Sequence, residues 1–240
     1  MVTRATKLIL GMALLAGAFL TASASQVFAA SPQFMTSWSA NSFAPSWYQG
    51  KIFPTKGSKF TVSFELVGQD SSNLGKILDL SNSQIKWYIN DRFYTQQVGL
   101  KSITFTNITY PGSTINVRIS AEVTNPSDGT SSFMDDYVAI PVVSPEVVIF
   151  NKNFSNIISL NSTVDFSAAP FFFNANSIND ISAVWNVGGQ QSDKNSQDPF
   201  SVSVKFGQNI SPGMINVGIT AQNVNNALET AASSLGFTIQ

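Results

Sequence analysis

The stretch Pro111-Gly112-Ser113-Thr114-Ile115-Asn116-Val117-Arg118-Ile119-Ser120-Ala121 returns, one residue shorter after the turn, as Pro212-Gly213-Met214-Ile215-Asn216-Val217-Gly218-Ile219-Thr220-Ala221. In both copies a Pro-Gly turn leads into a segment of alternating apolar residues, which is the period of a strand with one buried face. A lone tryptophan precedes each copy, and Trp87 and Trp185 lie 98 residues apart. The chain therefore carries one module twice, with a period of about 100 residues.

Alternating segments of the same kind recur along the rest of the chain. Turn formers separate them, for example at residues 54–57, 90–91 and 188–189. Glycine and asparagine tolerate positive φ there, and proline removes a donor that a strand would need. No amphipathic helix of useful length is found. Because about 100 residues is the length of one β-sandwich rather than of a solenoid unit, the sequence predicts an all-β chain of two tandem antiparallel β-sandwiches.

The first thirty residues follow the pattern of a secretory signal peptide. Arg4 and Lys7 precede an apolar stretch over residues 8–20, and small residues then lead to Ala29-Ala30. We expect residues 1–30 to be a signal peptide, with retention as an uncleaved membrane anchor as the alternative. Two prolines bracket a short connector at residues 141–145. The first sandwich is therefore expected at residues 31–143 and the second at residues 144–240.

The two tryptophans are expected in the cores of the sandwiches, because one large ring fills the gap between sheets about 10 Å apart. Trp87-Tyr88-Ile89-Asn90-Asp91 and Trp185-Asn186-Val187-Gly188-Gly189, each followed by a Pro-Gly turn and a long alternating strand, resemble the Ig-like or PKD-like β-sandwich modules that occur in tandem in uncharacterised bacterial exported proteins. The resemblance covers residues 33–240. The Gly-Asp-Gly turn typical of PKD domains is missing after either tryptophan, so the Ig-like form is the better description. The resemblance implies adhesion, spacing or assembly at a cell surface.

The composition excludes several classes of function. The chain has no histidine and no cysteine, so serine triads, papain-like dyads and zinc sites of imidazole or thiolate cannot form. Asp135 and Asp136 are neighbours on a predicted strand, so their carboxylates should point to opposite faces. Without residues 1–30, 11 basic residues remain against 14 acidic ones, and no basic run occurs. We therefore expect no catalytic residues and no nucleic-acid partner.

Calcium is the metal that oxygen ligands alone could hold. The spacing of the available side chains lacks the glycine and the terminal glutamate of an EF-hand loop, and short Asx side chains at such positions are typical of turn caps. We therefore predict no metal site and no cofactor. The side chains considered are Asp193, Asn195 and Asp198 in one loop and Asn174, Asn176, Asn179 and Asp180 in another.

Several aromatic side chains cannot all point inward, and they give the best hypothesis for a binding site. If residues 171–173 are extended, the side chain of Phe172 points to the face opposite its two neighbours. By the same geometry, Trp47 and Tyr48 point to opposite faces, and Tyr88 points away from the core that holds the preceding tryptophan. Trp47, Tyr48 and Phe172 are therefore candidate binding residues, because exposed rings stack on sugars or dock a partner. The alternative is that the neighbouring module, residues 34–53 or another subunit covers these rings.

These observations lead to two hypotheses about function. The first is a non-enzymatic, exported, extracellular or cell-surface protein that acts in adhesion, in spacing or as a structural component. The alternative is a carbohydrate-binding protein that uses the exposed aromatic residues. The expected partners are thus a surface protein or a polysaccharide, and a membrane would be contacted only through an uncleaved N-terminal segment.

Overall fold

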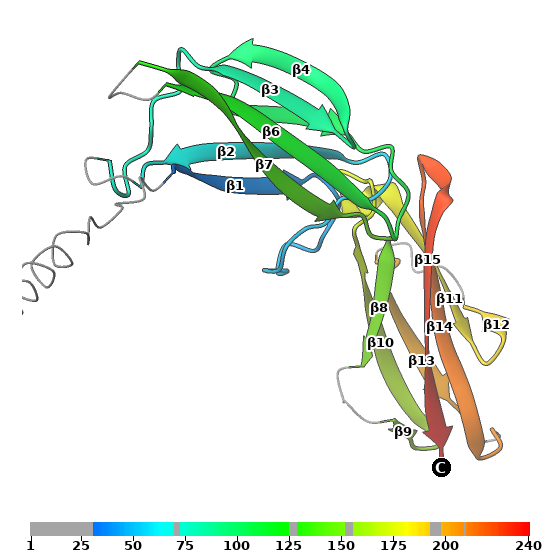
Figure 1. The fold of residues 1–240 in the computed structure, drawn as a ribbon. Helices are drawn as coiled ribbons and strands as arrows, with labels where there is room; N and C mark the ends of the chain where they lie inside the picture. Colours follow the sequence, from blue (N-terminus) through cyan, green and yellow to red (C-terminus); the bar gives the residue numbers. More distant parts are fainter. Residues whose placement is uncertain (1–30, 70–72, 125–128, 152–155, 193–197, 209) are drawn as a thin grey trace, which may run out of the picture. The chain divides into compact units, whose positions relative to one another are not determined.

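The computed structural model describes residues 31–69, 73–124, 129–151, 156–192, 198–208 and 210–240. The predicted signal peptide, residues 1–30, lies outside the described residues. Regular structure in the described part is β-strand, apart from one 3₁₀ turn, η1 (Ile178–Asp180). No helix there has the length and apolar composition needed to cross a membrane. The predicted all-β fold is confirmed (Figure 1).

The described residues group into two compact units. Leu66–Leu78 group with residues 31–33, and Phe34–Glu65 group with Asp79–Gln240. Most of both sandwiches lies in the second of these units.

The first sandwich has two sheets. One has the order β1-β2-β5 and consists of β1 (Gln33–Ala40), β2 (Lys59–Val67) and β5 (Ser102–Thr106). The other has the order β4-β3-β6-β7 and consists of β4 (Arg92–Val98), β3 (Gln84–Ile89), β6 (Thr114–Thr124) and β7 (Ser131–Pro141), with antiparallel pairing throughout. The rings of Phe64 on β2 and Trp87 on β3 meet between the sheets, with centroids 5.7 Å apart.

The second sandwich repeats this plan. One sheet has the order β13-β10-β8 and consists of β13 (Ser201–Phe206), β10 (Ser162–Phe171) and β8 (Glu146–Asn151). The other has the order β12-β11-β14-β15-β9, from β12 (Gln190–Gln191), β11 (Ile181–Val187), β14 (Gly213–Asn223), β15 (Asn226–Ile239) and β9 (Ile157–Ile158). The last pair, β15 with β9, is parallel. Phe166 of β10 and Phe237 of β15 meet across the core, with ring centroids 5.2 Å apart.

The order in which the chain visits the sheets is the same in both sandwiches, apart from the short strand β9. Two strands are laid in one sheet, two in the other, the next returns to the first sheet and the last two complete the second. In the second sandwich, β9 lies between the first two of these strands and joins the edge of the other sheet beside β15. This is the A-B-E and C′-C-F-G arrangement of an immunoglobulin-like sandwich. The fold is therefore Ig-like, with β3 and β11 as the C strands. β7 ends at Pro141 and β8 begins at Glu146, and we propose that the domain boundary lies between these strands, after Val143.

Each C strand carries its tryptophan into the core. Trp87 is 0% exposed and Trp185 is 5% exposed. The indole N–H of Trp87 donates to the carbonyl oxygen of Leu100 at 2.9 Å, and that of Trp185 donates to the carbonyl oxygen of Pro199 at 3.0 Å. Both carbonyls belong to the chain just before the E strand, β5 or β13. Each indole therefore fills its core and also fixes the entry of the chain into the opposite sheet.

A buried carboxylate organises one end of the second sandwich. Glu229 on β15 is 7% exposed. One carboxylate oxygen accepts the backbone N–H of Asn174 at 2.6 Å, and the other accepts the side-chain amide of Asn223 at 2.6 Å. That amide also donates to the carbonyl oxygen of Asn174 at 2.8 Å. The network thus holds the chain that leaves β10 against the hairpin of β14 and β15.

Candidate binding surface

Two of the predicted binding residues, Trp47 and Tyr48, lie in residues 41–58 between β1 and β2, and this segment also contacts the third, Phe172. Phe43 in this segment forms an isolated β-bridge with Phe173. The N–H of Phe43 donates to the carbonyl oxygen of Phe173 at 2.6 Å. The carbonyl oxygen of Phe43 accepts the N–H of Phe172, also at 2.6 Å. β10 ends at Phe171, and Phe172 has a left-handed φ of 61°. The expectation that residues 171–173 are extended is therefore wrong, because the backbone turns at the middle phenylalanine.

Phe172 is 8% exposed and does not present its ring to solvent. It belongs to a small apolar cluster with Phe171 and Ala169. The ring of Tyr48 forms a T-shaped pair with that of Phe171, with centroids 5.3 Å apart, and the ring of Phe53 forms one with that of Phe172 at 5.8 Å. The rings of residues 171–172 are thus covered by residues from the segment before β2, which is one of the alternatives open from the sequence.

Trp47 is the predicted candidate whose ring lies open to solvent, with 62% of the residue exposed. Its ring stands at 82° to that of Phe171, with centroids 5.9 Å apart, so the indole is supported by this one T-shaped contact. Tyr48 is half-buried, and its hydroxyl donates to the carbonyl oxygen of Lys51 at 3.3 Å. The Lys51 ammonium in turn lies 4.0 Å from the ring centre of Trp38 and donates to that residue's carbonyl oxygen.

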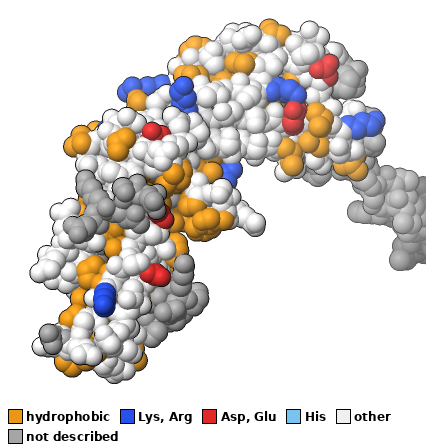
Figure 2. Space-filling model, turned by 180° about the vertical axis from the view of Figure 1, so that it is seen from behind, with side chains coloured by type: hydrophobic (Ala, Val, Ile, Leu, Met, Phe, Trp, Pro, Cys, Tyr) orange, Lys and Arg blue, Asp and Glu red, His pale blue; other side chains and the backbone are white. Residues whose placement is uncertain are grey.

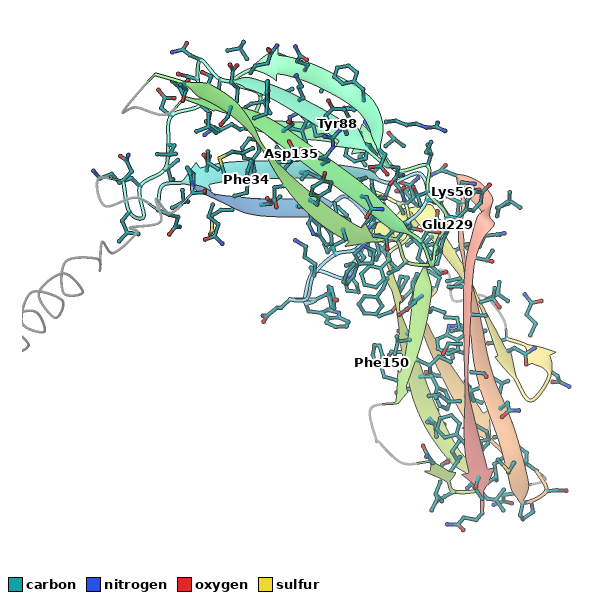
Figure 3. All side chains as sticks on the ribbon, in the orientation of Figure 1. Phe34, Lys56, Tyr88, Asp135, Phe150 and Glu229 are labelled. Atoms are coloured by element: carbon teal, nitrogen blue, oxygen red, sulfur yellow. The ribbon has the colours of Figure 1, made fainter. Side chains whose placement is uncertain are left out.

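A second aromatic surface covers the outer face of the sheet β4-β3-β6-β7. The register places Phe93, Tyr88, Arg118 and Tyr137 opposite one another in a row across the four strands. Tyr137 is 66% exposed, and Phe93 is exposed as well. Figure 3 shows Tyr88 and Asp135 on this sheet. We call the outward side chains of this sheet the aromatic face, defined by Lys86, Tyr88, Phe93, Arg118, Phe133, Asp135 and Tyr137.

Cations and rings are paired within the aromatic face. The guanidinium of Arg118 lies 3.6 Å from the ring centre of Tyr88, and its Nη1 lies 3.2 Å from a carboxylate oxygen of Asp135. The ammonium of Lys86 lies 4.1 Å from the ring centre of Phe133. Partial removal from water opposes the charge of Arg118, but the hydrogen bond and the negative charge of Asp135 outweigh it and raise the pKa of Arg118. The face is therefore ordered and carries both signs of charge.

The second sandwich has small residues at the corresponding positions. Asn186 on β11, Gly218 on β14 and Ser234 on β15 stand opposite one another, in the places that Tyr88, Arg118 and Tyr137 occupy in the first sandwich. The same fold thus forms without large aromatic or charged side chains on this face. Fold stability alone does not account for the aromatic face of the first sandwich.

The sequence carries part of the signal for this surface, although its aromatic residues are not among the predicted binding residues Trp47, Tyr48 and Phe172. Alternation assigned Trp87 to the core and so assigned Tyr88 to the opposite side. The same rule places Phe93, Phe133 and Tyr137 at positions where the other strands carry polar residues. The alternation does not show how the strands pair. That register brings these residues, which are far apart in sequence, into one row across the sheet.

The carboxylates of Asp180 and Asp198, which are oxygen ligands by their chemistry, accept hydrogen bonds from the backbone. The carboxylate of Asp180 accepts the backbone N–H groups of Asn176 and Ser177, and that of Asp198 accepts the N–H of Phe200 at 3.0 Å. Asp193 and Asn195 lie outside the described residues. Within the part that is described, no three acidic side chains gather as a metal site would require.

Asp135 and Asp136 take opposite sides of β7. Asp135 pairs with Arg118 on the aromatic face, whereas Asp136 accepts the hydroxyl of Thr36 on β1 at 2.7 Å. The two carboxylates therefore do not converge on one substrate. On the side of the molecule seen in Figure 2, charged side chains are few and hydrophobic side chains form several separate patches.

Comparisons with known proteins add little beyond the fold. No protein-family model matches the chain, and no curated protein does. One similar solved structure is a surface glycan-binding protein from a mixed-linkage glucan utilization locus of Bacteroides ovatus, in complex with a mixed-linkage heptasaccharide. It is 13% identical to this chain with a TM-score of 0.24, and the match covers 88% of this chain and 47% of that one. The chain thus spans about half the length of that protein.

Two further solved structures are built of immunoglobulin domains. An amphioxus IgVJ-C2 molecule is 11% identical with a TM-score of 0.30, over 78% of this chain and 99% of that one. The Ig1-Ig2 part of Dpr2, solved with DIP-Theta Ig1-Ig3, is 8% identical with a TM-score of 0.24, over 79% and 93%. At such low identities and scores, the assignment of an Ig-like fold rests on the strand order of the chain itself.

Proposed function

We propose that the protein is a non-enzymatic adhesion protein of the cell surface or extracellular space, and that its first sandwich binds a protein partner through the aromatic face. The observation that carries the proposal is the row of Phe93, Tyr88, Arg118 and Tyr137 across four paired strands. Its location outside the cytoplasm rests on the secretory pattern of residues 1–30. The absence of histidine and cysteine from the sequence is consistent with a binding role.

The chemistry of the aromatic face favours a protein over a sugar polymer or a polyanion. Tyrosine, phenylalanine and arginine are enriched at protein interfaces, and tyrosine and arginine also at their energetic hot spots. One side of the Tyr88 ring is covered by Arg118 and one side of the Phe133 ring by Lys86, which reduces the ring area left for a sugar to stack on. The mixture of Lys86 and Arg118 with Asp135 also offers no uniform field for a polyanion.

The second sandwich provides the test, because it shows which residues the fold accepts at these positions. Replacing Tyr88→Asn and Tyr137→Ser together installs the residues found at the corresponding places in the second sandwich. We expect the double variant to fold normally, because Tyr137 is exposed and because the second sandwich has Asn186 and Ser234 at these two positions. It should bind cell envelopes at least about 30-fold more weakly, as expected when a hot spot is lost. Binding is measured by biolayer interferometry on envelopes isolated from the producing cells.

Two treatments of the envelopes identify the class of partner. Protease treatment should abolish binding of the wild-type protein, and periodate oxidation of sugars should leave it intact. A matched variant, Thr220→Ser on the outer face of the second sandwich, should bind like wild type. The proposal is wrong if the double variant binds envelopes as tightly as the wild type, or if periodate rather than protease removes the binding.

Trp47 supports carbohydrate binding as a second candidate function. The residue is 62% exposed, and its indole contacts Phe171 in a T-shaped pair, so much of the indole surface stays open to the C–H groups of a sugar. Exposed Ser46 and Gln49 flank it and can hydrogen-bond hydroxyls. Aromatic stacking with flanking polar groups is the usual chemistry of an open sugar-binding surface.

We expect Trp47→Ala to abolish binding on a glycan array or in a pull-down with cell-wall polysaccharide, without change in the circular dichroism spectrum. Tyr137→Ser is the control, because it removes an exposed ring from a different surface. If the wild-type protein retains no polysaccharide, or if Trp47→Ala retains as much as the wild type, carbohydrate recognition by this tryptophan is excluded.

A further inference from the structure

A pocket of about 510 Å³ opens in the first sandwich, at the side where the edge strands of the two sheets, β4 and β5, approach one another. Its volume lies within the range of small-molecule sites, about 300–1,000 Å³. It is separate from the aromatic face and from Trp47, and neither proposed function uses it. Its lining consists of Ile89, Asn90, Arg92, Tyr94, Phe105, Thr106, Asn107, Ile108, Thr109 and Ile115.

The walls of the pocket are apolar and fixed by contacts of their own. The rings of Tyr94 and Phe105 lie 5.6 Å apart, and Phe105 packs on the buried ring of Phe60 with centroids 3.9 Å apart. The hydroxyl of Tyr94 donates to the carbonyl oxygen of Thr104 at 3.4 Å, which ties β4 to β5. Ile115, a buried core residue, forms part of the lining. The pocket is thus preformed and gives an apolar group access to the core.

The polar side chains of the lining differ in what they can offer a ligand. The side chain of Asn107 is already engaged, since its amide donates to Thr55 at 2.9 Å and its oxygen accepts the N–H of Thr109 at 2.8 Å. Asn90 accepts the N–H of Asn116 at 2.9 Å. Arg92 is exposed, and within the described residues its guanidinium makes no ion pair or hydrogen bond. It is the one charged side chain in the lining.

We propose that this pocket binds an apolar group that carries a carboxylate, with the carboxylate paired to Arg92. Arginine offers a planar pair of donors that matches a carboxylate. Its single charge balances that of a carboxylate but only part of that of a phosphate monoester. The apolar part of the ligand takes the space bounded by Tyr94, Phe105 and Ile115. This chemistry has two natural sources, a free medium-chain acid and the C-terminal residue of a peptide with an apolar side chain.

The test is isothermal titration of the full chain with octanoate, with 1-octanol, and with a short peptide that ends in leucine, as the free acid and as the amide. We expect octanoate or the peptide acid to bind, and octanol and the amide to bind more weakly. Arg92→Gln should weaken binding of the carboxylate ligand about 10- to 100-fold, the range for a hydrogen bond to a charged group, and leave octanol unchanged.

A second variant tests the same ion pair while Arg92 itself is kept. Ile108 lines the pocket and is strongly exposed, so Ile108→Glu should fold normally and place a competing carboxylate near the guanidinium. It should weaken the carboxylate ligand as well, while Lys205→Gln, which removes an exposed cation from the second sandwich, should have no effect. The proposal is overturned if neither octanoate nor the peptide acid binds at millimolar concentration, or if Arg92→Gln weakens octanol as much as octanoate.

Discussion

Trp87→Ala and Trp185→Ala are each expected to lower the free energy of unfolding of the sandwich that carries them by about 3–5 kcal/mol. Both indoles are buried, and removal of either leaves a large cavity between the sheets. The carbonyl oxygen of Leu100 or Pro199 also loses its donor. Because a domain of this size is stable by about 5–15 kcal/mol, the loss is a large share of the total.

Urea denaturation followed by circular dichroism measures this effect, since the signal does not depend on the tryptophan that is removed. Trp87→Phe separates the two contributions, because it keeps most of the ring and loses the hydrogen bond to Leu100; we expect it to cost less than alanine does. Trp47→Ala is the control for an exposed tryptophan and should change stability by less than about 0.5 kcal/mol. A loss below about 1 kcal/mol in both buried variants would contradict the role given to the C-strand indoles.

The hydrophobic alternation predicted the fold class well because it reports directly on a physical requirement. A strand of a sandwich must turn every second side chain to the core, so the inward residues of the two copies could be identified without any structure. The C-strand position of Trp87 and Trp185, and the all-β structure of the part of the chain that the structure describes, follow from the same rule. These features depend on residues near one another in sequence.

The candidate site was harder to predict because it depends on pairing between distant residues. Tyr88 and Tyr137 are 49 residues apart in sequence and reach one row only through the pairing of β3 with β6 and of β6 with β7. Phe172 was assigned to a surface on the assumption of an extended chain, but its left-handed φ turns it into a cluster with Phe53. A pattern of periodicity gives neither the register between strands nor such a change in backbone direction.

The internal repeat separates the features that both sandwiches share from those in which they differ. Both copies keep the indole, its hydrogen bond and the order of the strands, and these are the features that the fold requires. They differ on the outer face of the C′-C-F-G sheet, where Arg118 in the first copy corresponds to Gly218 in the second. One copy therefore forms this sheet without such residues, and the proposed interface of the first sandwich rests on this difference.

Glu229→Ala is expected to lower the free energy of unfolding of the second sandwich by about 2–4 kcal/mol, because it leaves two donors without their acceptor in a buried place. The donors are the backbone N–H of Asn174 and the side-chain amide of Asn223, each 2.6 Å from a carboxylate oxygen. Asn174 directly follows the Phe171–Phe173 turn, so the loss should also loosen the contacts of Phe172.

The matched variant Glu229→Gln keeps the shape of the side chain and one oxygen acceptor, while its amide group replaces the second acceptor. It should therefore cost less than alanine, since one of the two hydrogen bonds remains available. Hydrogen exchange of the Asn174 amide measures the local effect, and urea denaturation measures the global one; in Glu229→Ala that amide should exchange much faster than in the wild type. Equal stability of Glu229→Ala and wild type would show that the buried carboxylate does not hold the chain after β10, and that Phe43 and Phe173 pair without its help.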